Sequence, residues 1–523
     1  MKQNDYNQRQ ELFKTIWNIA EDLRNRVDGW DFKAYVLGFL FYRYLSEDFV
    51  KFANSLEPGS DFNYQDLDDH EINADMKKQL IEWKGYYIAP SQLAQNVAKT
   101  NDDPSRLENF NETLATIFKA IENSSAAGGT NCLSGLFNEI NLNGDKLGKQ
   151  TLDRNQRLLK VLQRINELDL GNFDDNRIDI FGDAYEYLIR MYASNAGKSG
   201  GEFYTPQEVS ELLFRLATVN KNRIKTIYDP ACGSGSLLLK ATKMLDDKNN
   251  LKIYGQEVSV TAYNLARMNM FLHGIHYNNF NIKCDDTLVH PQHQDQKFDI
   301  IVSNPPYSTK WAGKNDPQLI ADERFSIAGA LAPTKAADFA FIMHIIHHLQ
   351  AGGNAAVVCF TGIMHRKGAE QKIRQYLVDH NYISAIIQLP PNIFYGTSIS
   401  TVIMVLSKAK TDGKVVFIDA TNEYQKVNKN NQLNQDHIDK IVDHYENRKE
   451  VEHFAKVVTN EEIAANDYDL SVNRYVKKLI VREVIDIDQL EQELESCLAN
   501  INQLSSDIKA IAKQIRNGTF LKK

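Results

Sequence analysis

The order of apolar and polar positions divides the chain into regions with different patterns. From about residue 8 to 165 the pattern is helical, and the stretch 30–45 is long, apolar and free of turn signals, which predicts a buried helix. Gly and Asn cluster at 126–131 and 141–144, which marks loops between helices. This region shows neither β-alternation nor a recognisable catalytic motif. The pattern therefore predicts an α-helical N-terminal domain, residues 1–165, whose role is packing.

Short β-rich runs alternate with helical stretches from about residue 180. Strands separated by helical segments predict a mostly parallel sheet that is covered on both faces. Seven strands suit one doubly wound, Rossmann-like α/β domain, to which we assign residues 166–425. The predicted strands are residues 224–228, 252–256, 281–284, 298–303, 354–360, 383–389 and 400–406.

The C-terminal part changes character twice. Residues 426–480 are polar and rich in Asn, Lys and Glu, and they predict a linker with some helix. In residues 481–523 apolar side chains recur at alternating spacings of three and four, an unbroken heptad seam. Such a seam requires another helix: the tail either folds back on its own domain or, as we prefer, pairs with a helix of another chain. The seam consists of Ile487, Leu490, Leu494, Cys497, Ile501, Leu504, Ile508, Ile511 and Ile515.

Charge and cysteine usage narrow the function classes. The 523 residues include 60 basic and 68 acidic ones, a net charge of −8, whereas proteins that grip DNA alone usually carry a basic footprint. Contact with DNA would therefore need local patches or a partner subunit. The five scattered cysteines form no CxxC pair, which argues against disulfides and a zinc site. Without a signal-like N-terminus or a bilayer-length apolar run, the sequence predicts a soluble, cytoplasmic protein without membrane contact.

A glycine-rich turn follows the first predicted strand, where residues 228–236 read YDPACGSGS. Asp229 ends the strand, and Gly233 and Gly235 let the backbone turn tightly and approach a ligand. Glu257 ends the next strand, where an acidic residue can accept hydrogen bonds from ribose hydroxyls. An NAD site stays possible from this pattern, although the turn lacks the GxGxxG form. The nucleotide contacts expected from this turn and strand are Asp229, Gly233, Ser234, Gly235, Ser236 and Glu257.

The segment 298–307, FDIIVSNPPY, carries the candidate chemistry. Prolines fix φ and donate no N–H, so the Asn304 side chain and the Pro305 carbonyl should face the crevice at the strand ends. Two such acceptors can bind both N–H protons of an exocyclic amine and point its lone pair at a methyl donor. Tyr307 can stack on a base taken out of the duplex. The predicted catalytic residues are Asn304, Pro305, Pro306 and Tyr307, with direct transfer and no cysteine nucleophile.

Two more segments flank these motifs. In residues 199–208, SGGEFYTPQE, Thr205, Pro206 and Glu208 predict a capping box for the following helix. The preceding glycines and aromatics exceed what capping requires. After the third strand come two adjacent acids, of which we prefer Asp286 over Asp285 as a ligand contact.

These motifs resemble those of S-adenosylmethionine-dependent amino-methyltransferases. DPxxGxG resembles motif I, GEFYTP resembles motif X, CDDTL looks like the third motif, which meets the adenine edge, and NPPY is the amino-transfer motif. NPPY also occurs in enzymes that methylate protein glutamine or RNA guanine, and cytosine-N4 enzymes more often have serine first, so the motif leaves the substrate open. The resemblance implies S-adenosyl-L-methionine as cofactor, with further contacts from Glu202, Phe203, Tyr204, Thr205, Pro206, Gln207 and Asp286.

A wider resemblance covers most of the chain. The order of motif X, motif I and NPPY resembles the gamma class of DNA amino-methyltransferases. The segments 31–45, 368–374, 387–394 and 468–475 are similar to methylation (M) subunits of type I restriction–modification systems. This implies N6-adenine methylation of a flipped base in DNA, two M subunits per sequence-reading specificity subunit, and an ATP-driven restriction subunit as a further partner. The alternatives are a methyltransferase acting on protein or RNA, and a catalytically silent DNA-binding scaffold.

Two features remain outside these motifs. His344 and His348 lie four apart on a predicted helix, which is metal-ligand spacing, but no Glu or Cys joins them. We therefore predict a structural role and no metal. The long stretch 308–335 either closes over a flipped base or contacts phosphates, or it is a solvated insertion. It carries Lys310, Trp311, Lys314, Arg324 and Lys335.

Overall fold

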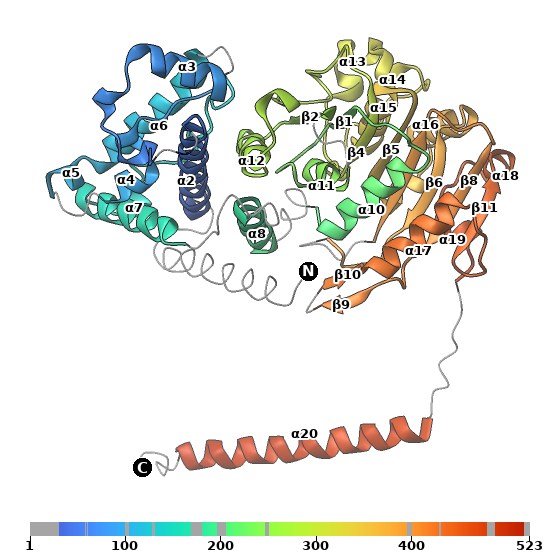
Figure 1. The fold of residues 1–523 in the computed structure, drawn as a ribbon. Coiled ribbons are helices and arrows are strands. Elements are labelled where there is room, and N and C mark those ends of the chain that lie inside the picture. Colours follow the sequence, from blue (N-terminus) through green and yellow to red (C-terminus); the bar gives the residue numbers. More distant parts are fainter. Residues whose placement is uncertain are drawn as a thin grey trace. The chain divides into compact units, whose positions relative to one another are not determined.

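The computed structural model divides into two compact units, residues 1–477 and 478–523 (Figure 1). Among the helices that the structure describes, none is long and apolar enough to cross a membrane. The structure describes residues 31–57, 59, 61–99, 104–127, 131–168, 180–195, 205–245, 250–394, 400–427, 430–478 and 487–516.

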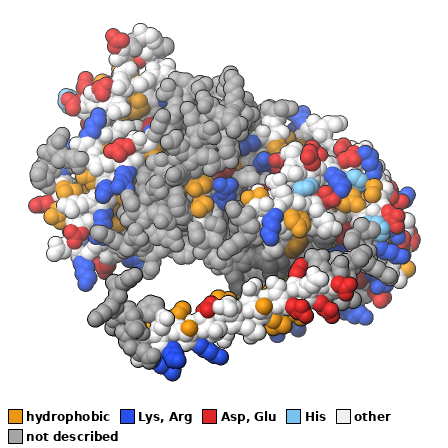
Figure 2. All heavy atoms as spheres, turned by 90° about the horizontal axis from the view of Figure 1, so that it is seen from below, with side chains coloured by type: hydrophobic (Ala, Val, Ile, Leu, Met, Phe, Trp, Pro, Cys, Tyr) orange, Lys and Arg blue, Asp and Glu red, His pale blue; other side chains and the backbone are white. Residues whose placement is uncertain are grey.

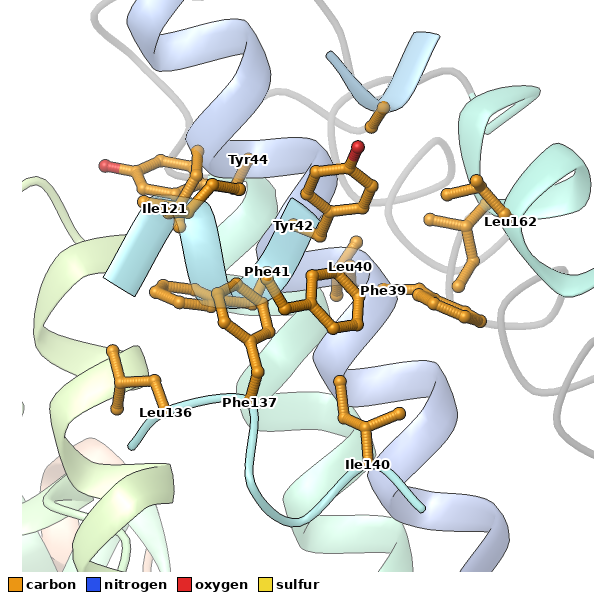
Figure 3. Close-up of a cluster of buried hydrophobic side chains, with 14 of the residues drawn as sticks. Phe39, Leu40, Phe41, Tyr42, Tyr44, Ile121, Leu136, Phe137, Ile140 and Leu162 are labelled. Carbon is orange, nitrogen blue, oxygen red and sulfur yellow. The ribbon is translucent and has the colours of Figure 1, made fainter. Parts of the chain in front are cut away.

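Helix α2 (Asp31–Ser55) runs through the core of the N-terminal region. Its side chains from residue 35 to 46 are all buried, which confirms the predicted buried helix. Phe41 packs against Phe137 with ring centroids 5.8 Å apart, and Phe137 stacks on Phe118 at 4.3 Å (Figure 3). The other described helices here are α3 (Ala74–Lys84), α4 (Ala94–Ala98), α5 (Pro104–Glu108), α6 (Phe110–Ala127), α7 (Thr151–Asn166) and α8 (Ile180–Asn195).

A nine-stranded sheet forms the centre of the following region, in the order β11-β8-β6-β7-β5-β4-β1-β2-β3. Strands β3, β2, β1, β4 and β5 pair in parallel, and β7 is antiparallel to both neighbours. The strands are β1 (Thr226–Asp229), β2 (Lys252–Glu257), β3 (Phe280–Cys284), β4 (Phe298–Ser303), β5 (Leu349–Phe360), β6 (Ile383–Gln388), β7 (Thr401–Ser407), β8 (Lys414–Asp419) and β11 (Ala455–Thr459).

All seven predicted strands are present, but the sheet has two more than the sequence predicts. The extra strands are β8, parallel to β6, and β11, antiparallel to β8 at the sheet edge. The segment 426–480 is therefore not a simple linker, since it adds β11, a small hairpin (β9, Gln425–Val427; β10, Asn430–Gln432) and helix α17 (Gln435–Glu446) to the first unit. Its polar composition hid β11 because that edge strand is only partly buried.

Helices cover both faces of the sheet. Side chains alternate along β4, so Ile300 and Val302 join a core with helices on one face and Ile301 joins the core on the other. The first core includes residues of α10 (Gln207–Thr218), α11 (Ser236–Met244), α12 (Val260–Leu272) and α17. The second includes residues of α13 (Pro317–Ala321), α14 (Glu323–Ser326), α15 (Asp338–His348), α16 (Ala369–Asp379), α18 (Asn460–Ala465) and α19 (Val472–Tyr475).

The N-terminal helices and the sheet region meet at α12. Its residues Leu265, Met268, Phe271 and Leu272 belong to the same core as α2. Arg267 donates to the carbonyls of Ser134 at 2.9 Å and Cys132 at 2.8 Å. Helix α12 thus has one side in the N-terminal core and the other against the sheet.

The second unit contains helix α20 (Ile487–Arg516), 30 residues long. Figure 2 shows apolar side chains along it, with acidic side chains toward one end and basic ones toward the other. The exposed apolar residues are Leu490, Leu494, Leu498, Ile501, Leu504, Ile508, Ile511 and Ile515.

Candidate active site

The turn after β1 has the tight backbone that its glycines predict. Gly233 and Gly235 have φ values of 52° and 77°, in the left-handed region. A Cβ on Gly235 would lie 3.0 Å from Cε of Met270 on α12. Asn269 of the same helix donates to the carbonyl of Ser234 at 3.1 Å. Helix α12 therefore holds the turn from behind.

The serines of this turn point inward. Ser234 and Ser236 are 2% and 3% exposed, and their hydroxyl oxygens lie 3.1 Å apart. Because the Ser234 and Ser236 side chains are buried, only the backbone groups of these two predicted cofactor contacts remain for a ligand.

Glu257 at the end of β2 joins that strand to the turn. One carboxylate oxygen accepts the N–H of Gly233 at 2.9 Å, and the other accepts the N–H of Ser259 at 2.9 Å. Burial raises the pKa of Glu257, and these hydrogen bonds counteract it. Because a carboxylate offers about four lone-pair sites, others remain for ligand hydroxyls. The next side chain, Val258, is 67% exposed, an apolar surface that the sequence analysis did not single out.

Asn304 follows β4 directly and lies half-buried. Its side-chain nitrogen donates to the hydroxyl of Thr205 at 3.2 Å, and its side-chain oxygen accepts a short hydrogen bond from the hydroxyl of Tyr307. Pro305 is buried and Pro306 half-buried. The structure therefore brings together the predicted residues Asn304, Tyr307 and Thr205 from two distant segments.

The strand carrying Asn304 is bonded to the strand carrying the glycine turn. β1 and β4 pair in parallel, so their carboxyl ends lie at the same edge of the sheet. The hydroxyl of Ser303 donates to Asp229 at 2.7 Å, and the N–H of Ala231 donates to the same oxygen at 3.0 Å. Asp229 is 2% exposed, and burial raises its pKa to about 7.

The motif X segment is described only in part. Glu202, Phe203 and Tyr204 lie outside the described residues. The predicted capping box is wrong: Pro206 is the N-cap of α10, with no side-chain cap bond. The Thr205 hydroxyl instead accepts from Asn304. Gln207 donates to Glu186 at 3.0 Å.

Asp286 is exposed in the loop after β3. One of its oxygens accepts the N–H groups of Leu288 at 2.9 Å and Val289 at 3.3 Å. Its neighbour Asp285 accepts from Gln292 at 3.1 Å. Asp286 thus caps a local turn, and its predicted contact with a cofactor stays a prediction.

The sequence analysis missed Asp338 as a support of the catalytic loop. Ser308, next to Tyr307, has a φ of 52°, and its N–H donates to Asp338 at 3.1 Å. Asp338 is 5% exposed, and burial raises its pKa. The only carboxylate in helix α15, at its first residue, was the available signal.

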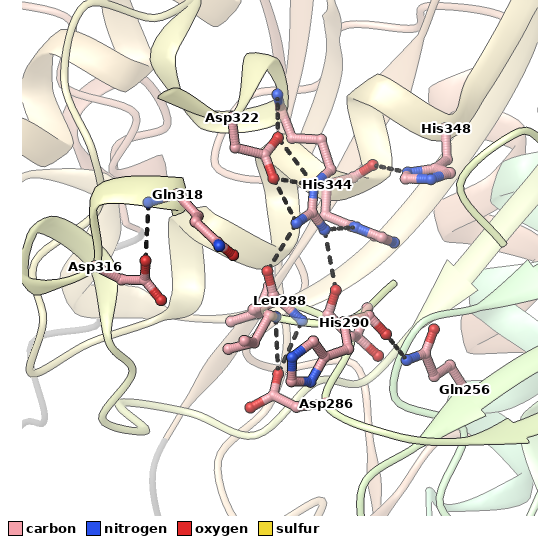
Figure 4. Close-up of polar contacts among 12 residues, drawn as sticks. Gln256, Asp286, Leu288, His290, Asp316, Gln318, Asp322, His344 and His348 are labelled. Carbon is pink, nitrogen blue, oxygen red and sulfur yellow. Dashed lines mark hydrogen bonds and ion pairs between the residues drawn. The ribbon is translucent and has the colours of Figure 1, made fainter. Parts of the chain in front are cut away.

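Arg324 is not available for phosphates, because it is buried and anchors the insertion to the domain. It pairs with Asp322 at 2.7 Å and donates to the carbonyls of Thr287 and Leu288 (Figure 4). It also meets Nδ1 of His344 at 2.9 Å, while Nε2 of His344 lies 3.1 Å from the Tyr228 hydroxyl. These contacts give His344 a structural role, as the sequence predicts.

One group of metal-ligand side chains occurs within the described part of the chain. Asp183, Glu186 and His273 have ligand atoms within 4.8 Å of one another. Asp183 pairs with Lys243 at 3.5 Å, and burial lowers the pKa of His273 to about 3. We assign no ion to this group.

Comparisons with known proteins identify the family of the chain. Residues 176–483 match the N-6 DNA methylase family, and residues 12–165 match the HsdM N-terminal domain. The chain is 45% identical to the type I restriction enzyme MpnII methylase subunit of Mycoplasma pneumoniae, over 99% of this chain and 98% of the relative. It is 30% identical to the MjaVII methylase subunit of Methanocaldococcus jannaschii, over 92% of this chain and 80% of the relative.

Solved structures give the same result. The type I restriction-modification system methyltransferase subunit from Streptococcus thermophilus matches with a TM-score of 0.80 at 35% identity, covering 90% of this chain and 100% of that one. A structure described for complex assembly and conformational transition of the type I R-M system matches with a TM-score of 0.60 at 19% identity, which supports the fold alone. The chain belongs to the family of type I restriction–modification methylase subunits with an N-6 DNA methylase domain.

Proposed function

We propose that this chain transfers a methyl group from S-adenosylmethionine to the N6 amine of an adenine in DNA. The observation that carries the proposal is the position of Asn304, half-buried at the carboxyl end of β4. The preceding residue, Ser303, is hydrogen-bonded at 2.7 Å to Asp229, which opens the glycine turn. An amine held by Asn304 would therefore lie close to a cofactor held by that turn.

The residues around the turn fit an adenosyl cofactor. The left-handed Gly233 and Gly235 allow close backbone approach, and Glu257 has lone pairs left for ribose hydroxyls. The exposed Val258 offers an apolar surface to a purine ring. We also propose Asp229 as a contact, with Ser234 and Ser236 contributing backbone, Thr205, Pro206, Gln207 and Asp286 at the margins, and Glu202, Phe203 and Tyr204 outside the described residues.

Asn304 and Pro305 would orient the amine. When bound, S-adenosylmethionine supplies a methyl group on a positively charged sulfur. An exocyclic amine is a poor nucleophile because its lone pair is delocalised into the ring. The Asn304 side-chain oxygen has two lone pairs, of which Tyr307 uses one, so the other can accept an amine N–H while the Pro305 carbonyl accepts the second. The lone pair then points toward the methyl group, and positioning supplies most of the acceleration.

Base flipping belongs to the same proposal. A duplex adenine cannot reach a half-buried side chain, so the target base must leave the stack, and Tyr307 can then stack on it. The N-6 DNA methylase match and the near full-length relative favour DNA over protein glutamine, RNA or cytosine-N4 as the substrate.

Replacing Asn304 tests the chemistry. We expect Asn304→Ala to lower methyl transfer by about a thousandfold, because it removes one of two acceptors that position the amine. Cofactor affinity, measured by calorimetry, should change by less than about threefold. The matched control is Asn278→Ala, at an exposed position next to the amino end of β3.

The product identifies the substrate. Transfer should be measured with the chain co-expressed with its neighbouring open reading frames, by mapping N6-methyladenine in DNA. Substantial methylation by Asn304→Ala would place the active site elsewhere, and methylated protein or RNA without methylated DNA would favour the alternatives.

We further propose that α20 binds the specificity subunit. Its apolar seam is exposed over residues 490–515, and a heptad seam of this length requires a partner helix. Delegating sequence recognition to that partner fits a net charge of −8. We propose two copies of this chain per specificity subunit and a restriction subunit in the larger complex.

A further inference from the structure

Four cationic side chains near the catalytic loop have no part in the proposed chemistry. They are Lys310, Lys335, Arg366 and Lys367, which we call the basic rim. The three lysines are exposed, and the Arg366 side chain is 39% exposed. Within the described chain, none of these lysines has an ion pair closer than 4.0 Å. The three lysine charges are therefore available to a ligand, whereas Arg366 already pairs with Glu370 at 3.6 Å.

Backbone hydrogen bonds hold two of these lysines side by side. The N–H of Ala337 donates to the carbonyl of Thr309 at 2.9 Å, and the N–H of Trp311 donates to the carbonyl of Thr334 at 3.1 Å. Lys310 and Lys335 lie on the two segments that these bonds join. The Trp311 indole also donates to the carbonyl of Pro333 at 3.0 Å. The two lysines are thus fixed by backbone contacts rather than carried on an open loop.

Asp338 brings both parts of the basic rim to the catalytic loop. It accepts the N–H of Ser308, next to Tyr307, at 3.1 Å. Arg366 is close enough to Asp338 to counteract the rise in its pKa that burial causes. Arg366 and Lys367 follow β5, which pairs in parallel with β4. The basic rim therefore comes from three segments: the one that follows Tyr307, the one that precedes Asp338, and the one that follows β5.

The middle of the insertion, residues 316–323, carries acidic side chains instead. A groove of about 360 Å³ is lined by Asp295, Asp316, Asp322 and Glu323, together with the paired Arg324. Figure 4 shows Asp316 and Asp322 in this part of the molecule. A polyanion would be repelled from this groove and attracted to the basic rim.

We propose that the basic rim binds phosphates of the DNA strand that carries the target adenine. This inference rests on the proposed function and deepens it by naming the surface that holds the substrate. A net charge of −8 gives the chain no overall attraction for DNA, so local cations on this chain would retain the strand beside Tyr307 alongside contacts from a partner subunit. Lysine ammonium groups on a fixed backbone suit phosphodiester oxygens as point charges.

The test uses three variants. The first is a double variant that combines Lys310→Gln and Lys335→Gln, the second is Lys367→Gln, and the third is the control Lys414→Gln. Lys414 is exposed and begins β8, at the amino end of a strand parallel to β6. Each variant is purified as the full chain with its co-expressed specificity subunit. DNA affinity is measured by fluorescence anisotropy between low and moderate salt, and cofactor affinity by calorimetry.

For the double variant we expect the magnitude of the slope of log affinity against log salt to decrease by about 1 to 2, with roughly five- to tenfold weaker DNA binding. Lys367→Gln should lower the slope by about 1. Cofactor affinity should change by less than about twofold. Lys414→Gln should behave as the wild type.

Three results would overturn the inference. If the double variant keeps the DNA affinity and the salt slope of the wild type, and the wild type methylates DNA, the inference about the basic rim is refuted while the proposed function stands. An equal effect from Lys414→Gln would reduce it to a general charge effect. A wild-type complex that methylates no DNA would refute the proposed function, and the inference with it.

Discussion

The side-chain amide of Asn304 is oriented by a residue 99 positions earlier in the chain. Its nitrogen donates to the Thr205 hydroxyl at 3.2 Å, which leaves its oxygen on the side of Tyr307. If the side-chain nitrogen of Asn304 loses its acceptor, the amide group can rotate by about 180° and exchange the positions of its oxygen and nitrogen. The oxygen would then no longer face the amine of the substrate.

We expect Thr205→Val to lower the turnover number about tenfold, because it removes one hydrogen bond and keeps the shape of the side chain. Thr205→Ser, which retains the hydroxyl, should recover most of the activity. The measurement is steady-state methylation alongside the dissociation constant of the cofactor. A tenfold loss of cofactor affinity at unchanged turnover would instead make Thr205 a cofactor contact.

Much of the candidate site could be predicted residue by residue because its residues lie in short contiguous motifs. Gly233, Gly235 and Asn304 stand within a few residues of the strand that positions them. The bond between Thr205 and Asn304 joins two distant segments, so no local pattern indicates it. The burial of Arg324 could not be predicted for the same reason: a cation in a polar insertion is usually solvated, but here Asp322 and backbone carbonyls satisfy it.

At the scale of elements, strands β1 and β4 are joined at their carboxyl ends by a buried acid. Asp229 accepts from Ser303 and Ala231, and burial raises its pKa to about 7. The folded chain binds this proton more tightly than the unfolded chain does. The associated stability is complete below the usual pKa of an aspartate and is lost as the pH rises through about 7.

Asp229→Asn should remove this pH dependence, because the amide stays neutral and its oxygen still accepts both hydrogen bonds. Relative to the variant, the wild type should lose roughly 3 kcal/mol of stability between pH 5 and pH 8.5. Thermal unfolding of both proteins at these two pH values measures the difference. Parallel pH dependence of the two melting temperatures would contradict the assignment.

Strand prediction succeeded where an apolar run is bounded by turn signals, as in the central strands β1, β4 and β5. It missed β8, although that buried strand has the apolar run 415–418 shortly after Gly413 and could have been predicted by the same rule. It also missed β11, an edge strand paired on one side only, whose half-buried residues lack a continuous apolar run. Edge strands need less apolar surface, so their composition resembles that of loops. The polar composition of residues 426–480 therefore suggested a linker.

For the whole molecule, the two units should be separable. All three hydrophobic cores lie between residues 35 and 476. Removing residues 479–523 should therefore leave the melting temperature within about 2 °C and preserve cofactor binding. Association with the specificity subunit, and with it site-specific methylation, should be lost.

Point variants separate this prediction from a simple truncation effect. Leu494→Glu combined with Ile501→Glu places charges on the seam of α20, whereas Ala499→Glu places one outside it. Co-purification with the specificity subunit, followed by light scattering to obtain the stoichiometry, should fail for the first and succeed for the second. Normal assembly of the seam variant would show that α20 is not the contact.

The composition of α20 also bears on how a partner finds its correct alignment. From Leu490 to Ile515, every a and d position is leucine or isoleucine except Cys497, which is exposed. Sliding a partner by seven residues would exchange one aliphatic side chain for another at almost no loss, so those positions barely distinguish one alignment from the next. The smaller thiol breaks this translational degeneracy, since only one alignment sets a bulky group opposite the shallow point. In the proposed pairing, Cys497 is thus the seam position at which alternative alignments would differ.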